Sequence, residues 1–176
     1  MGTFGNAVGT SVSARSADTK AVLRTQAPES GTIVKLTAKL DGAGSGTGSQ
    51  VVKGVVYADS AADPNALWAD SAEVTVTDGQ AAGEVDFLFT YGIPITSGTY
   101  YHLGLIMGAN TNTIQWYNNG GTGLSHYGND TYSDGPSDPF GALTESGTNW
   151  WIYATYITPP TIAASQVGND IQVSWS

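Results

Sequence analysis

The stretch that decides the fold is Thr32–Leu40, which reads TIVKLTAKL. From Val34 onward, apolar residues occupy the even positions, and lysine or threonine occupies the odd ones. A period of two is typical of a β-strand with one face on a core and the other in water. The stretch therefore predicts a half-buried strand whose solvent face carries positive charge.

Similar patterns recur along the chain, separated by turn signals. Ala72–Thr77 and Glu84–Phe89 alternate, whereas Gln50–Asp59 is apolar on both faces, as expected of a central strand. Further strands are predicted at Lys20–Gln26, Thr99–Met107, Thr113–Asn118 and Asn149–Ile157. Turns are predicted between them, for example at Asp41-Gly42, Asp63-Pro64-Asn65 and Asp78-Gly79.

Glycine accounts for 23 of the 176 residues, which favours short strands and tight turns over helices. The composition excludes a coiled coil, a helical bundle, a disordered acidic tail and a membrane span. We predict an all-β fold, an antiparallel β-sandwich of jelly-roll type. The expected core consists of Val34, Leu36, Leu40, Val74, Val76, Val85, Phe87, Phe89, Leu103, Leu105 and Ile152.

Charge is distributed unevenly along the chain. All six lysines and arginines lie in the first 53 positions, and twelve carboxylates but no basic residue follow. The net charge of −9 repels phosphates, so nucleic acid is not an expected partner. The chain has no cysteine, which leaves neither disulfides nor thiolate chemistry.

The end of the chain differs from its body. Residues 1–158 are predicted to form one β-sandwich module, and Thr158-Pro159-Pro160 has the composition of a linker. Residues 159–176 then run as a short strand, a turn and a strand ending in Trp175, which resembles the start of a fibronectin type III domain. Neighbouring modules of a longer protein are thus expected; alternatively, these are the last two strands of the body.

Aromatic residues gather in the last third of the body, next to amides. Sugar rings stack their C–H faces on exposed aromatic rings, and amides bond sugar hydroxyls. A glycan-binding role competes with packing in the core, because one member of each adjacent pair on a strand points outward or meets a second layer. The candidate glycan-binding residues are Trp116, Tyr117, Tyr127, Tyr132, Trp150, Trp151, Asn118 and Gln115.

An acidic loop, Asn129–Asp138, is the candidate metal site. Asp130, Asp134 and Asp138 recur every four residues, with glycine and proline to bend the chain. Ca²⁺ takes six to eight hard oxygen ligands, and no basic residue follows Lys53 in sequence to neutralise these carboxylates. Bound Ca²⁺ is one interpretation; the other is that aspartates simply form turns.

The sequence offers little for catalysis. It has two histidines, His102 and His126, and no His-Glu-x-x-His or Gly-x-Ser-x-Gly motif. Glu73, Glu84 and Asp86 lie on polar faces of alternating strands, where solvated charge is usual. A non-enzymatic protein is therefore expected, with a paired-carboxylate hydrolase or lyase as an alternative.

Several segments carry a resemblance to a known group of proteins, among them Gln50–Ser60, Ser97–Tyr101, Asn129–Tyr132, Asp134–Gly141 and Ile152–Tyr156. The matching stretches span most of residues 4–157, and they resemble β-sandwich modules of actinobacterial phage minor tail proteins and of secreted or surface-anchored bacterial proteins. The resemblance implies a non-catalytic module, extracellular or on a virion surface, that decorates a tail or surface protein and binds a polysaccharide or cell-surface glycan. A purely structural module, either alone or as a homo-oligomer, is the alternative.

Overall fold

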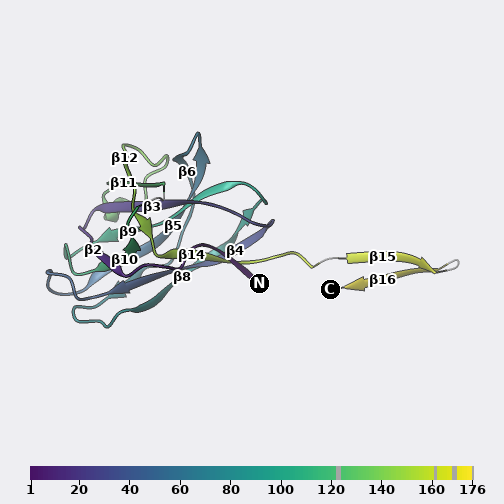
Figure 1. Ribbon diagram of the computed structural model, residues 1–176, viewed down its shortest axis with the longest axis horizontal. Helices are drawn as coiled ribbons and strands as arrows, with labels where there is room; N and C mark the ends of the chain where they lie inside the picture. The colour runs from purple at the N-terminus through teal and green to yellow at the C-terminus, as the bar shows by residue number, and fades with distance from the viewer. Residues whose placement is uncertain (122–123, 161, 168–169, 176) are drawn as a thin grey trace.

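The computed structural model describes residues 1–121, 124–160, 162–167 and 170–175, and side chains as far as residue 160. The chain is nearly all β, and two seven-stranded antiparallel sheets pack face to face (Figure 1). This confirms the all-β sandwich; the jelly-roll connectivity stays a prediction. Among the described residues no helix is long and apolar enough to cross a membrane.

The first sheet is built around β4 (Gly31–Asp41), the strand that contains the TIVKLTAKL stretch. β14 (Ile152–Ile157) lies along one side of β4, and β8 (Gly83–Ile95) lies along the other. The remaining strands of this sheet are β1 (Gly2–Asn6), β2 (Ser11–Ala14), β10 (Gln115–Asn119) and β13 (Asn149–Trp150).

The second sheet runs in the order β12-β11-β3-β9-β5-β6, and β7 also pairs with β5. Its central strands are β3 (Thr19–Gln26), β9 (Tyr100–Gly108) and β5 (Gln50–Ser60). Its outer strands are β6 (Asp63–Asp70), β7 (Val74–Val76), β11 (Ser125–Asn129) and β12 (Thr144–Ser146).

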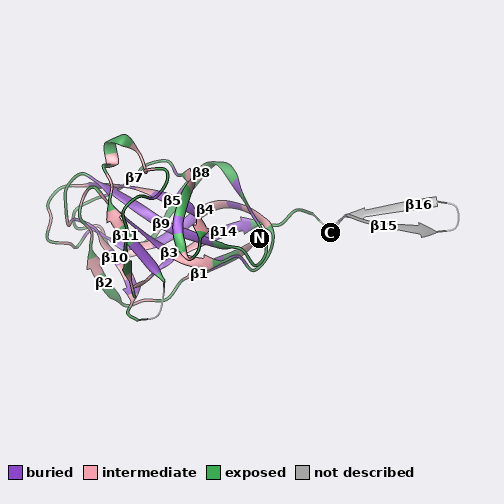
Figure 2. Ribbon diagram, turned by 90° about the horizontal axis from the view of Figure 1, so that it is seen from above, coloured by how far each residue is buried: buried purple, intermediate pink, exposed green. Residues whose placement is uncertain are grey.

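The core lies between the sheets, where Figure 2 shows the buried segments in purple. Seven of the expected core residues are buried, namely Leu36, Leu40, Val76, Phe87, Leu103, Leu105 and Ile152. Val74, Val85 and Phe89 are partly buried and pack against them.

The prediction that Val34 lies in the core is wrong, because Ile33 takes its place there. The pairing of β4 with β8 shifts between Ile33 and Lys35, and this irregularity reverses the inward and outward directions of the side chains at that point. Ile33 is fully buried, and Val34 is only half-buried. The alternation of the sequence is regular there, so it gave no sign of the shift.

The turn predicted at Asp63-Pro64-Asn65 is also corrected, because those residues begin β6. The turn falls on Ala61 and Ala62, which have φ angles of 53° and 79°. Two consecutive positive φ angles are typical of the tight turn of a two-residue hairpin. Glycine and asparagine are the usual residues in such a turn, so the two alanines gave no sequence signal for it.

A second, smaller core lies on the outer face of the second sheet. Segment 130–143, which connects β11 to β12, brings Phe140 down onto Val22, Val55 and Tyr57. The segment begins with a short 3₁₀ turn at Tyr132–Asp134. It covers a face that would otherwise be in water.

β15 (Ile162–Val167) and β16 (Asp170–Trp175) form a separate two-stranded antiparallel sheet (Figure 1). The predicted boundary at residue 158 falls just after β14. The assignment of residues 159–176 to the start of another domain stays a prediction.

Candidate functional site

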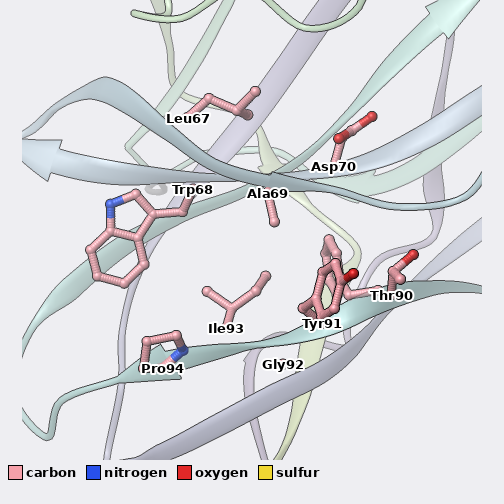
Figure 3. A pocket seen from close by; sticks show the side chains of 10 residues that line it. Leu67, Trp68, Ala69, Asp70, Thr90, Tyr91, Gly92, Ile93 and Pro94 are labelled. Atoms are coloured by element: carbon pink, nitrogen blue, oxygen red, sulfur yellow. The ribbon is translucent and has the colours of Figure 1, made fainter.

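A groove of about 680 Å³ opens at the edge of the sandwich between β6 and β8 (Figure 3). These strands belong to different sheets, so the groove lies where the two layers part. It is lined by Leu67, Trp68, Ala69, Asp70, Phe89, Thr90, Tyr91, Gly92, Ile93 and Pro94. Figure 3 shows Trp68 and Pro94 toward one end and Tyr91 toward the other, with Ile93 between them.

Trp68 is placed by a β-bulge. Val56 and Tyr57 of β5 pair with Ala69 and Leu67, so Trp68 is an extra residue without a partner in β5. Bulges re-aim side chains, and here Leu67 packs into the small core while 44% of Trp68 stays exposed. The indole rests edge-to-face on buried Tyr101, with ring centroids 5.3 Å apart, which holds it in position.

Tyr91 is placed by a larger irregularity in β8. Ile33 pairs with Ile93 and Lys35 pairs with Leu88, so four residues of β8 stand opposite one residue of β4. The excess bends residues 89–92 away from the ladder, and Tyr91 is 83% exposed. A side chain on Gly92 would collide with Thr32, because its Cβ would lie 2.2 Å from the Thr32 methyl group.

Polar groups complete the groove. The carboxylate of Asp70 accepts a hydrogen bond from the Lys53 ammonium at 2.9 Å, which fixes its direction. Thr90 is exposed beside it. The groove thus combines two accessible aromatic rings, an apolar floor at Ile93 and a polar rim.

The sequence pattern did not single out Trp68 or Tyr91 as candidates. One signal was present: Gly92 and Pro94 both interrupt the apolar run of β8, and these residues occur inside strands mainly at bulges or edges. For Trp68 no comparable signal exists, because the bulge depends on the register with β5.

Of the aromatic residues predicted to bind glycan, the three tryptophans are buried. Trp116 and Trp150 stack in the core with centroids 4.5 Å apart, and they are 0% and 4% exposed. The indole N–H of Trp116 donates to the carbonyl of Trp151 at 3.1 Å. Trp151 itself packs edge-to-face on Tyr153. Packing accounts for these contacts.

The other predicted residues are spread over β10, β11 and the 3₁₀ turn. Tyr117 lies under the Lys39 ammonium, Asn118 donates to Ser13 Oγ at 3.1 Å, and Gln115 donates to the carbonyl of Ala43. Tyr132 donates to Glu73 at 2.9 Å. Tyr127, which is 43% exposed, lines a smaller hollow of about 300 Å³ together with Trp150 and Arg15. Trp116 and Trp150 thus meet inside the core, and Tyr127 meets Trp150 at this hollow. Glycan binding by this set stays a prediction.

The three aspartates of the candidate metal loop are engaged separately. Asp130 forms an ion pair with the buried Lys20 ammonium at 2.8 Å, and Asp138 Oδ1 accepts from the Leu67 N–H at 2.9 Å. Asp134 lies in the exposed 3₁₀ turn. No cluster of three metal-ligating side chains occurs among the residues that the structure describes. Calcium binding stays a prediction.

Lys20 supplies the positive charge that the sequence near this loop lacks. It projects from β3, and its side chain is completely buried. Burial lowers its pKa, an effect that the hydrogen bond to Asp130 opposes.

The two histidines, His102 in β9 and His126 in β11, lie side by side with ring centroids 5.5 Å apart. His102 Nε2 lies 2.9 Å from Asp59 Oδ1, and Asp59 also accepts from the Arg24 guanidinium. Desolvation lowers the pKa of buried His102 to about 4, although the bond to Asp59 opposes the shift. His102 is therefore neutral at physiological pH.

No family model, curated protein or solved structure matches this chain.

Proposed function

We propose that this protein is a non-catalytic carbohydrate-binding module whose ligand lies in the groove between β6 and β8. The observation that carries this proposal is the pair of exposed aromatic rings, Trp68 and Tyr91, at the two ends of one groove. Irregularities in strand pairing turn both side chains outward, and neither side chain is needed to fill the core.

The chemistry of the groove suits a sugar. Rings that present one apolar face and a polar rim match the C–H faces and hydroxyls of a pyranose. A hollow of about 680 Å³ is within the range of small-ligand sites. Trp68 is already held by Tyr101, so its orientation costs little on binding.

The carboxylates near the groove support binding without hydrolysis. Most glycosidases flank the scissile bond with two carboxyl groups. Among the described residues that line the groove, Asp70 is the one carboxylate, and it is paired with Lys53. A hydrolase or lyase remains the less favoured alternative.

The setting that we propose is outside the cell or on a virion surface, in a longer protein with neighbouring modules. The acidic, lysine-poor surface suits that setting, and so does the resemblance to tail and surface modules described above. A homo-oligomer is compatible with it.

The test is a glycan array probed with the wild-type chain, followed by titration of each ligand found. We expect Trp68→Ala and Tyr91→Ala each to weaken binding by roughly tenfold, since truncation of a stacked aromatic removes about 1–2 kcal/mol. Tyr91→Ala should not change the melting temperature, because its side chain is 83% exposed.

Tyr127→Ala is the matched control, since Tyr127 is an exposed tyrosine of the other hollow. If Tyr127→Ala abolishes binding and the groove variants retain it, the site lies in the aromatic set predicted from sequence. If the wild-type chain binds no glycan, the purely structural module becomes the better proposal.

A further inference from the structure

Lys20 lies in an unusual place for a lysine. It is in β3, between β11 and β9, where it pairs with Gly128 and Ile106. Its side chain points into the small outer core and is 0% exposed. Lysine is almost never fully buried unless it is paired, so its partner determines what this position does.

The partner is Asp130, which immediately follows β11. Lys20 Nζ lies 2.8 Å from Asp130 Oδ2, and the Asp130 carboxylate is itself 9% exposed. Aromatic rings enclose the ammonium, with the Phe140 centroid at 4.1 Å and the Tyr57 centroid at 5.3 Å. The amine and the carboxyl carbon are thus held side by side with little water around them.

Ser137 connects the two groups. Its Oγ accepts a hydrogen bond from Lys20 Nζ and lies 3.2 Å from Asp130 Oδ2. Its backbone N–H also donates to Asp130 Oδ2 at 2.9 Å, which holds the carboxylate in place. A hydroxyl in contact with both groups can pass a proton from nitrogen to oxygen.

We propose that Lys20 Nζ and Asp130 Cγ condense after folding into an amide that covalently links β3 to the segment after β11. The ammonium passes a proton to the carboxylate through Ser137, and the nitrogen lone pair attacks Cγ. A second proton moves from nitrogen to the departing oxygen, the Cγ–O bond breaks, and one water leaves. Ammonium and carboxylate become amide and water, and no oxidant or co-reactant is needed.

Two physical effects favour this reaction inside the fold. Groups that are held in contact react as if at an effective concentration of up to about 10⁵–10⁸ M. Removing both charges also relieves the cost of keeping an ion pair out of water. The released water has an exit, because Asp130 and Ser137 line a hollow of about 580 Å³ that opens to solvent.

The decisive measurement is the intact mass of the purified chain under denaturing conditions. We expect a mass lower than that calculated from the sequence by one water molecule. Trypsin should fail to cleave after Lys20, so that Ser16–Arg24 stays attached to the fragment beginning at Gly54. Lys20→Met and Asp130→Ala should each restore the full mass, and Ser137→Ala should slow or stop the loss of water.

Lys35→Met is the matched control. Lys35 pairs with Asp86 at 2.7 Å, but the two side chains are 30% and 48% exposed, so this variant should keep the deficit. Aspartyl-glycine sequences can also lose water as succinimides. A deficit that persists in Lys20→Met would therefore overturn the proposal. The proposal would also be overturned if the wild-type chain had the calculated mass, both when freshly purified and after long incubation. Lys20 and Asp130 would then form an ion pair only.

Discussion

Buried His102 gives the fold a pH dependence that can be tested at a single residue. Its pKa is about 4 in the fold and about 6.5 in an unfolded chain, because burial disfavours the charged imidazole. Between these two pH values the unfolded state binds more protons than the folded state. The stability that depends on neutral His102 is therefore fully present above pH 6.5, and it is lost as the pH falls toward 4.

We expect the melting temperature to decrease between pH 7 and pH 4.5. Once the imidazole is fully protonated, the pKa shift of His102 lowers the free energy of unfolding by about 3 kcal/mol. For a chain of this length, that loss lowers the melting temperature by roughly 6–12 °C. His102→Gln keeps an N–H for Asp59 and cannot titrate, so its melting temperature should change less over the same range. An equal pH dependence in that variant would show that other groups are responsible.

The residues that a sequence identifies correctly are those whose neighbours in the chain determine their role. Alternation alone placed Leu36 and Phe87 in the core, and the structure confirms both. It could not show whether Trp116 faces a ligand or the core, because that depends on Trp150, which reaches it from another strand. Lys20 and Asp130 are likewise distant in sequence, and only the pairing of β3 with β11 brings them together.

At the scale of elements, strands were predictable and their irregularities were not. Most predicted strands overlap observed ones, since period-two patterning is a local property. Bulges, in contrast, arise where two strands disagree in length, as β8 and β4 do opposite Val34. The irregularity between β4 and β8 that makes the prediction of Val34 wrong also turns Tyr91 outward. A separate bulge between β5 and β6 turns Trp68 outward, and the two irregularities together create the groove.

Calcium binding by segment 130–143 can be tested through the melting temperature. If calcium holds this segment through Asp130, Asp134 and Asp138, EDTA should lower the melting temperature, and Asp134→Ala should abolish the difference. Binding to the folded state alone adds about 2.7 kcal/mol at a hundredfold excess of ligand over Kd. An unchanged melting curve would leave the segment held by its contacts with Lys20 and the small core.

At the scale of the whole molecule, each of the six lysines and arginines lies against a carboxylate or an aromatic ring. Lys20, Arg24, Lys35 and Lys53 are each paired with an aspartate. The other two basic residues lie over rings, Arg15 over Trp150 and Lys39 over Tyr117. All six positive charges are therefore engaged, while the net charge stays at −9. The long-range field around the protein is negative.

This charge distribution predicts which glycans the groove accepts, if the proposed function holds. Uronic acid and sulfated polymers are repelled, so the ligands found should be neutral. Stacking and neutral hydrogen bonds are not screened by ions, so affinity for them should change by less than about twofold between low and high salt. Titration of one neutral ligand and one sulfated polymer over a range of sodium chloride tests this directly. Tight binding of the sulfated polymer at low salt, weakening as salt is added, would contradict it, because such behaviour requires a cationic surface.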